Sequence, residues 1–129
     1  MSWTWSDAWV LTATYACVTA QNPAGLADIV AAGDHINHSI FTDEEFEHAF
    51  TRLTAAGLVE VVPGNKILVT DAGLQLCKEA VDPVREALRA TDNVDRALRA
   101  IELGEVIPVE IPPAVLDAAR QRYLEGHAV

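Results

Sequence analysis

Basic residues are absent from the first 51 positions of this 129-residue chain, where neither lysine nor arginine occurs. The same stretch holds seven aspartates and glutamates and so carries a formal charge of −7. Residues 52–129 hold nine bases and twelve acids, which leaves −3. Nucleic acids are polyanions and are repelled by such a surface. The amino-terminal half is therefore not expected to bind nucleic acid.

Long apolar runs are also missing. The longest apolar-leaning stretch, AWVLTATYACVTA (8–20), is too short to span a bilayer and contains threonines. Only Asp7 precedes it, where a signal peptide would have basic residues. Cysteine is scarce: Cys17 and Cys77 lie far apart in apolar surroundings, which favours two reduced core thiols over a disulfide. We therefore expect a cytoplasmic protein without a membrane segment.

Motifs that carry catalysis are lacking as well. There is no Gly-x-Ser-x-Gly nucleophile motif and no glycine-rich phosphate-binding loop. The many carboxylates follow the pattern of a solvated helix face rather than that of a general acid–base pair. The sequence therefore predicts a protein that is not an enzyme and needs no cofactor.

Half of the residues are hydrophobic and 22% are charged, which is typical of one globular domain. Ser6 or Asp7 can cap a first helix. The helical spacing predicts that Ala8, Leu11, Tyr15 and Val18 face the core. Asn22 is expected to cap, and Pro23 to open, a second helix. Its core-facing residues are Leu26, Ile29, Val30, Gly33 and Ile36.

A third helix is predicted to begin after Thr42. Thr42 and Glu45 have the spacing of a capping box, and Phe41 and Phe46 that of a hydrophobic staple. Gly57 is expected to end the helix. The predicted buried stripe is Phe46, Ala49, Phe50 and Leu53. The residues LVEVVPGNKILVT (58–70) then predict a β-hairpin that turns at Pro-Gly, and Thr70 is expected to cap the next helix.

The carboxyl-terminal third is predicted to form two more helices. We expect one amphipathic helix over 83–103, with a break at residues 91–93 as the alternative. Its apolar face would hold Ala87, Ala90, Val94, Ala97, Leu98 and Ile101, and its opposite face Arg85, Arg89, Arg96 and Arg99. An extended, proline-stiffened segment, EVIPVEIPP, follows at 105–113. The last helix, 113–125, would bury Val115, Leu116, Ala119 and Tyr123 and stop at Gly126.

The order helix, helix, helix, hairpin, helix resembles the winged helix-turn-helix fold. The stretch FTDEEFEHAFTRLTAAGLVEVVPGNKILVTDAGLQL is similar to the corresponding run of MarR-type and PadR-type transcription regulators. The likeness covers roughly residues 7–80. The expected fold class is thus mainly α with a small β-hairpin (α+β). It comprises a winged-helix core at 1–82 and a C-terminal helical extension at 83–129, which the resemblance makes a dimerisation arm.

In the family, the third helix enters the major groove and the wing contacts phosphates or the minor groove. Carried over, the third-helix face is Asp43, Glu44, Glu47, His48, Thr51 and Arg52. The wing comprises Pro63, Gly64, Asn65 and Lys66. This chain departs from the family where a base often follows "GLV", because Glu60 stands there. DNA affinity rests largely on cations, and this face is acidic.

Two functions follow as alternatives. The first is a homodimeric, non-enzymatic winged-helix module that acts through protein contacts, with its acidic third helix docking a basic partner or left idle. The second is a dimeric DNA-binding regulator. The arginine stripe (Arg85, Arg89, Arg96 and Arg99) could dock an acidic partner or be a solvated face. The histidines His35, His38 and His48 offer a weaker alternative, a metal site, against surface and capping roles.

Overall fold

The structure is a computed structural model that describes residues 2–127. These residues form six helices and one two-stranded antiparallel hairpin, which confirms the expected mainly α class. The elements are α1 (Trp5–Val18), α2 (Leu26–Asn37), α3 (Asp43–Ala55), β1 (Val59–Val62), β2 (Lys66–Val69), α4 (Asp71–Val81), α5 (Ala87–Arg99) and α6 (Pro113–His127).

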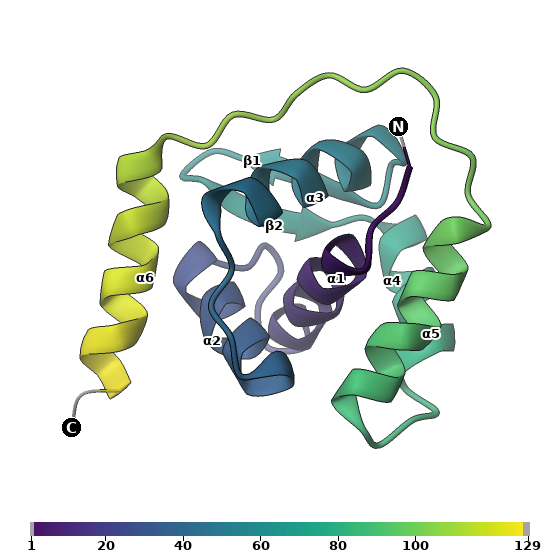
Figure 1. Ribbon diagram of the computed structural model, residues 1–129, viewed down its shortest axis with the longest axis horizontal. Helices are drawn as coiled ribbons and strands as arrows, with labels where there is room; N and C mark the ends of the chain where they lie inside the picture. Colours follow the sequence, from purple (N-terminus) through teal and green to yellow (C-terminus); the bar gives the residue numbers. More distant parts are fainter. Residues whose placement is uncertain (1, 128–129) are drawn as a thin grey trace.

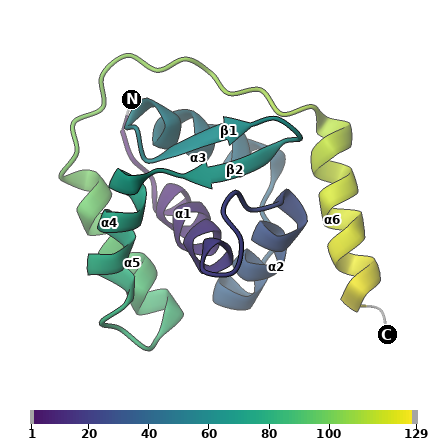
Figure 2. The same cartoon turned by 180° about the vertical axis from the view of Figure 1, so that it is seen from behind.

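Helix α1 runs through the middle of the molecule and contacts α2, α3 and α5 (Figure 1). Helices α4 and α5 pack together on one side, and α6 packs on α2 on the other side. The segment between α5 and α6 has no regular structure and passes over α3 (Figures 1 and 2). The order α1–α2–α3–β1–β2–α4 is the one expected from the sequence. A helical chain with one hairpin does not by itself identify a winged helix, so that resemblance stays a prediction.

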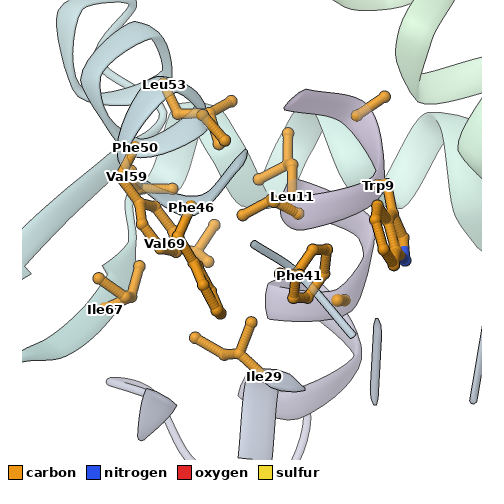
Figure 3. Packing of buried hydrophobic residues seen from close by; sticks show 14 of the residues in the cluster. Trp9, Leu11, Ile29, Phe41, Phe46, Phe50, Leu53, Val59, Ile67 and Val69 are labelled. Atoms are coloured by element: carbon orange, nitrogen blue, oxygen red, sulfur yellow. The ribbon is translucent and has the colours of Figure 1, made fainter. Parts of the chain in front are cut away.

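Aromatic side chains form the centre of the core (Figure 3). Ring centroids are 4.0 Å apart between Trp9 and Phe41, 4.8 Å between Phe41 and Phe46, and 5.6 Å between Phe46 and Phe50. The Phe41–Phe46 contact confirms the predicted staple. The predicted stripe of α3 is also confirmed, because all four of its residues are fully buried. Helix α3 is therefore held by its inner face.

The start of α3 has the predicted capping box. Glu45 donates its backbone N–H to the hydroxyl of Thr42 at 3.1 Å, and the Glu45 carboxylate accepts the Thr42 N–H at 2.9 Å. At the other end, Gly57 has a φ of +74°, a left-handed conformation that glycine adopts without strain. Gly33 of α2 is small for a different reason: a Cβ there would lie 2.2 Å from the ring of Phe41. Both helix ends and the α2–Phe41 contact thus follow from local residue choice.

The hairpin lies at 59–69, as predicted, with Val59 opposite Val69 and Val62 opposite Lys66. Its turn uses two residues with positive φ, Gly64 at +86° and Asn65 at +54°. Thr70 caps α4 by accepting the N–H of Gly73, also as predicted. The hairpin therefore needs no distant contact to explain its position in the chain.

The starts of α1 and α2 differ from the prediction. Thr4, not Ser6 or Asp7, is the N-cap of α1, and Asp7 occupies the third helical position of a capping box. Helix α2 begins at Leu26 with Gly25 as N-cap. Asn22 does not cap it, because its side-chain amide exchanges two hydrogen bonds with the backbone of Val69 on β2. Asn22, which the local pattern assigned to a cap, is therefore engaged in a tertiary contact instead.

Helix α5 is a single helix, without the alternative break at 91–93, but it is shorter than predicted. It begins after Glu86 rather than at 83, because residues 82–86 form a turn in which Val84 donates to the carbonyl of Val81. It ends at Arg99 rather than at 103. Ala87 is exposed, not buried as predicted, and it is the first residue of α5. The buried side chains are Ala90, Thr91, Val94 and Leu98.

Helix α6 continues through Gly126 to His127, so the predicted stop at Gly126 is wrong. Leu116 and Ala119 are buried as predicted, whereas Val115 and Tyr123 are half-buried. The connection before α6 is extended, as the prolines predicted.

Candidate interaction surface on the third helix

The exposed part of α3 borders a hollow of about 310 Å³ between the start of α1 and α3. Glu44 and His48 are exposed there. Glu45 is fixed by its capping bond and by a second bond, in which the hydroxyl of Ser6 donates to its carboxylate at 3.0 Å. The residues that line the hollow are Thr4, Ser6, Asp7, Glu44, Glu45, His48 and Arg52. Its accessible rim is therefore formed by two carboxylates, two hydroxyl groups and one imidazole.

Arg52 does not belong to the exposed face, contrary to the prediction. Its side chain points inward, where Nη1 donates to both carboxylate oxygens of Asp7 at 3.0 and 3.4 Å. Arg52 is 9% exposed and Asp7 is 1% exposed. Asp7 also accepts the N–H of Thr4, whereas Nε of Arg52 is buried without a partner among the described residues. The first base of the chain is thus used inside the fold, because a buried aspartate requires a cation beside it.

Thr51 is covered as well, which also departs from the prediction. It is 7% exposed, and its hydroxyl accepts the backbone N–H of Val109 at 2.8 Å. Val109 belongs to the segment that runs past the outer side of α3 in Figure 1, and the next apolar residue of that segment, Ile111, is buried. At the start of the segment, Trp3 donates its indole N–H to the carbonyl of Ile101 at 2.9 Å. One side of the outer face of α3 is therefore covered by the segment between α5 and α6.

Asp43 is half-buried and forms an ion pair with Arg120 of α6. The same guanidinium donates to the carbonyl of Phe41 at 3.2 Å and to Asp117 at 2.8 Å. Farther along α6, the hydroxyl of Tyr123 donates to Asp34 of α2 at 2.6 Å. This bond, together with burial and the charge of Asp34, raises the pKa of Tyr123. Of the predicted face, Glu44, Glu47 and His48 remain outside these contacts.

Sequence reasoning missed Arg120, Tyr123 and Val109 as neighbours of α2 and α3. Their partners lie 77, 89 and 58 positions away in the chain. The helical period predicts which residues of 113–125 face inward, and it included Tyr123. It contains no information on which helix that face meets.

The wing residues Asn65 and Lys66 do not extend the α3 surface. They line a separate hollow of about 410 Å³ together with the start of α2 and with Arg122 of α6. Figure 2 shows the turn of the hairpin directed toward α6. Lys66 is exposed there and Asn65 is half-buried.

The three histidines of the weaker metal alternative do not come together. His35 lines a groove between α1, α2 and the turn before α5, and His48 lies on α3. His38 ends α2 with a left-handed φ of +53°, so it does not continue the helix face of His35. Within residues 2–127, no three histidine, cysteine, aspartate or glutamate side chains form a group that could hold a metal ion. Because the helix ends at His38, His35 and His38 do not share one helix face.

The arginine stripe is divided. Arg85, Arg89 and Arg96 line a hollow of about 530 Å³, although Arg85 lies in the turn before α5 and not on the helix. Arg96 donates to Asn93 at 2.8 Å. Arg99 instead pairs with Asp95 at 3.0 Å, one turn earlier on α5. The stripe is therefore a cluster of three, with the fourth arginine engaged elsewhere.

Both cysteines are free thiols, as expected. Burial, with a smaller effect from Asp82, raises the pKa of Cys77 to about 12. Burial, with a smaller effect from Asp28, raises that of Cys17 to about 11. Both thiols are therefore protonated at neutral pH and are weak nucleophiles.

Comparison with protein-family models, curated proteins and solved structures gives no match for this chain. Within the described residues, no helix has the length and apolar character needed to cross a membrane.

Proposed function

We propose that the protein is a non-enzymatic winged-helix module that acts through protein contacts. Its docking surface would be the acidic patch, defined here as Glu44, Glu47 and His48 on α3. The observation that supports this most directly is the position of Arg52, which pairs with Asp7 in the interior. Without Arg52, the accessible part of α3 carries carboxylates and no arginine or lysine. A lysine or arginine on a partner protein complements such a surface.

The alternative, a DNA-binding regulator, is weakened by the same geometry. A helix in the major groove is flanked by phosphates, and affinity comes largely from lysine and arginine contacts to them. The acids of α3, of which Glu44 is exposed and Glu47 half-buried, would add repulsion, and the wing contributes only Lys66. Unmodified protein should therefore show no duplex binding at micromolar concentration, even at low salt. Tight binding to a duplex at physiological salt would instead establish the regulator.

A basic peptide tests the proposal directly. Fluorescence anisotropy with a labelled lysine-rich peptide should detect salt-sensitive binding to the unmodified protein. Replacing Glu44 and Glu47 by glutamine should weaken that binding about fivefold, because each exposed ion pair contributes up to about 1 kcal/mol. Glu60→Gln with Glu86→Gln makes the same charge change at two other exposed positions and should have little effect. Equal losses in both pairs would show general charge attraction and no docking surface.

Two further parts of the proposal concern assembly. The arginine cluster remains a candidate dock for an acidic partner. A homodimer also remains a prediction, although α5 packs on α1 and α4 and α6 packs on α2 within the chain. The apolar faces that suggested a dimer are thus used internally. Sedimentation at micromolar concentration distinguishes one chain mass from two.

A further inference from the structure

We propose that the C-terminal arm, residues 100–127, occupies Asp43 beside the docking surface and is displaced when a basic partner binds both the acidic patch and Asp43. This inference rests on the proposed function and adds its regulation. The arm runs along the outer side of α3 and ends as a helix against α2 (Figure 1). It covers Thr51 and forms an ion pair with Asp43, and both residues lie on the same side of α3 as Glu47. Opening the arm would therefore extend the acidic patch by Asp43.

Arg120 makes the contact that a basic partner would make. It pairs with Asp43 at the first turn of α3 and donates to the carbonyl of Phe41 just before that helix. A guanidinium is well suited to this position, because its planar set of donors can bind a carboxylate and a carbonyl together. Arg122, two positions along, lines the hollow beside Asn65 and Lys66, and among residues 2–127 it has no hydrogen bond or ion pair. The chain thus places one of its few bases on the acidic start of α3.

The arm is held by several polar bonds and by apolar packing. Apart from the contacts of Arg120, polar bonds join Trp3 to Ile101, Thr51 to Val109, and Asp34 to Tyr123. Ile111, Leu116 and Ala119 are buried, and five further side chains of the arm are partly buried against the core: Ile101, Leu103, Val109, Val115 and Tyr123. Ile107, in the middle of the segment between α5 and α6, is 84% exposed. A segment whose middle is exposed to solvent can open locally while the aromatic core stays folded.

Tethering gives the arm an advantage over a free partner. A segment held by a short linker acts at an effective concentration in the millimolar range. A partner that needs the open form binds with an affinity reduced by the fraction of molecules that are open. Weakening the arm should therefore raise the affinity for a basic peptide without any change on the acidic patch.

The experiment compares Arg120→Glu with Arg122→Glu in the full chain. The two variants change charge equally and lie on the same helix, but within residues 2–127 Arg120 has polar bonds to Phe41 and Asp43, whereas Arg122 only lines a hollow. Hydrogen exchange at the amide of Val109 reports arm opening, because that N–H is bonded to Thr51. Arg120→Glu should speed this exchange and raise the affinity for the lysine-rich peptide about tenfold. Arg122→Glu should change either quantity by less than about twofold.

Leu116→Ala opens the arm without a change of charge and completes the series. If arm opening controls binding, peptide affinity should rise with the exchange rate of Val109 across Leu116→Ala, Arg120→Glu and their combination. Faster exchange with unchanged affinity would overturn the competitor role while leaving the proposed docking surface intact. A peptide that binds none of these proteins, including the combined variant, would overturn the docking surface itself and the competitor with it.

Discussion

The two sides of α3 are held in different ways. Its inner side is packed by Phe46 and Phe50, both fully buried in the aromatic core. Its outer side is covered by the C-terminal arm through one backbone bond to Thr51 and one ion pair to Asp43. Burial of large apolar surface couples a residue to global unfolding, whereas a few polar contacts allow local opening. The comparison predicts that similar substitutions on the two sides will have unlike consequences.

The largest effect is expected from Phe50→Ala in the body, defined here as the described residues before the arm (2–99). Removing a fully buried phenylalanine from a close-packed core should lower the free energy of unfolding by about 3–5 kcal/mol. Urea denaturation followed by circular dichroism measures it. A loss below about 1 kcal/mol would mean that this side of α3 is not the rigid one.

The second largest effect is expected from Arg52→Met. It should lower the free energy of unfolding by about 3 kcal/mol, because it leaves the buried carboxylate of Asp7 without its cation. The N–H of Thr4 remains as a donor to Asp7, so the loss should lie near the lower end for a broken buried pair. Adding Asp7→Asn to the variant should recover part of the stability. Equal stability of the single and double variants would show that the ion pair does not stabilise the body.

Leu116→Ala is the counterpart of Phe50→Ala in the arm. Leu116 is also fully buried, and truncation should weaken arm closure by about 2 kcal/mol or more. Because the arm can open locally, the urea midpoint of the body should hardly move. Hydrogen exchange resolved by segment separates the two effects. A drop in global stability as large as that of Phe50→Ala would remove the distinction between body and arm.

Thr42→Ala should cost about 1 kcal/mol, since it removes an N-cap whose hydroxyl accepts the Glu45 N–H. Thr42 is exposed, so packing contributes little to the change. The melting temperature measures the loss, and Thr42→Ser, which keeps the hydroxyl, is the matched control. An unchanged melting temperature in Thr42→Ala would show that the cap is unimportant.

The smallest effect concerns pH. The pKa of Tyr123 lies above its usual 10.0, so the bond to Asp34 stabilises arm closure fully below pH 10 and is lost as pH rises through the raised pKa. In a Tyr15→Phe background, Tyr123 is the remaining tyrosine, and its phenolate absorbance should show a midpoint above 10. Asp34→Asn should return the midpoint toward 10. A midpoint at 10 with Asp34 present would show that Tyr123 does not donate a hydrogen bond to Asp34 in solution.

Local patterns determined much of the body. The capping box at Thr42 and Glu45, the staple of Phe41 and Phe46, the hairpin turn at Gly64 and the Thr70 cap each depend on residues within a few positions of one another. Such signals act before any tertiary structure exists, so the sequence alone locates α3, the hairpin and the start of α4. It also establishes that α3 begins with acids.

Tertiary structure alone decided which of those residues remain accessible. Asn22 pairs with β2 and therefore does not cap α2, and Arg52 turns inward to Asp7, 45 positions away. Arg120 reaches Asp43 across 77 positions. A helical period specifies an inner and an outer face, but the partner of each face is fixed by how the elements pack. The sequence determined that α3 is acidic, and the packing determined that its only arginine is hidden and that the arm covers one side of it.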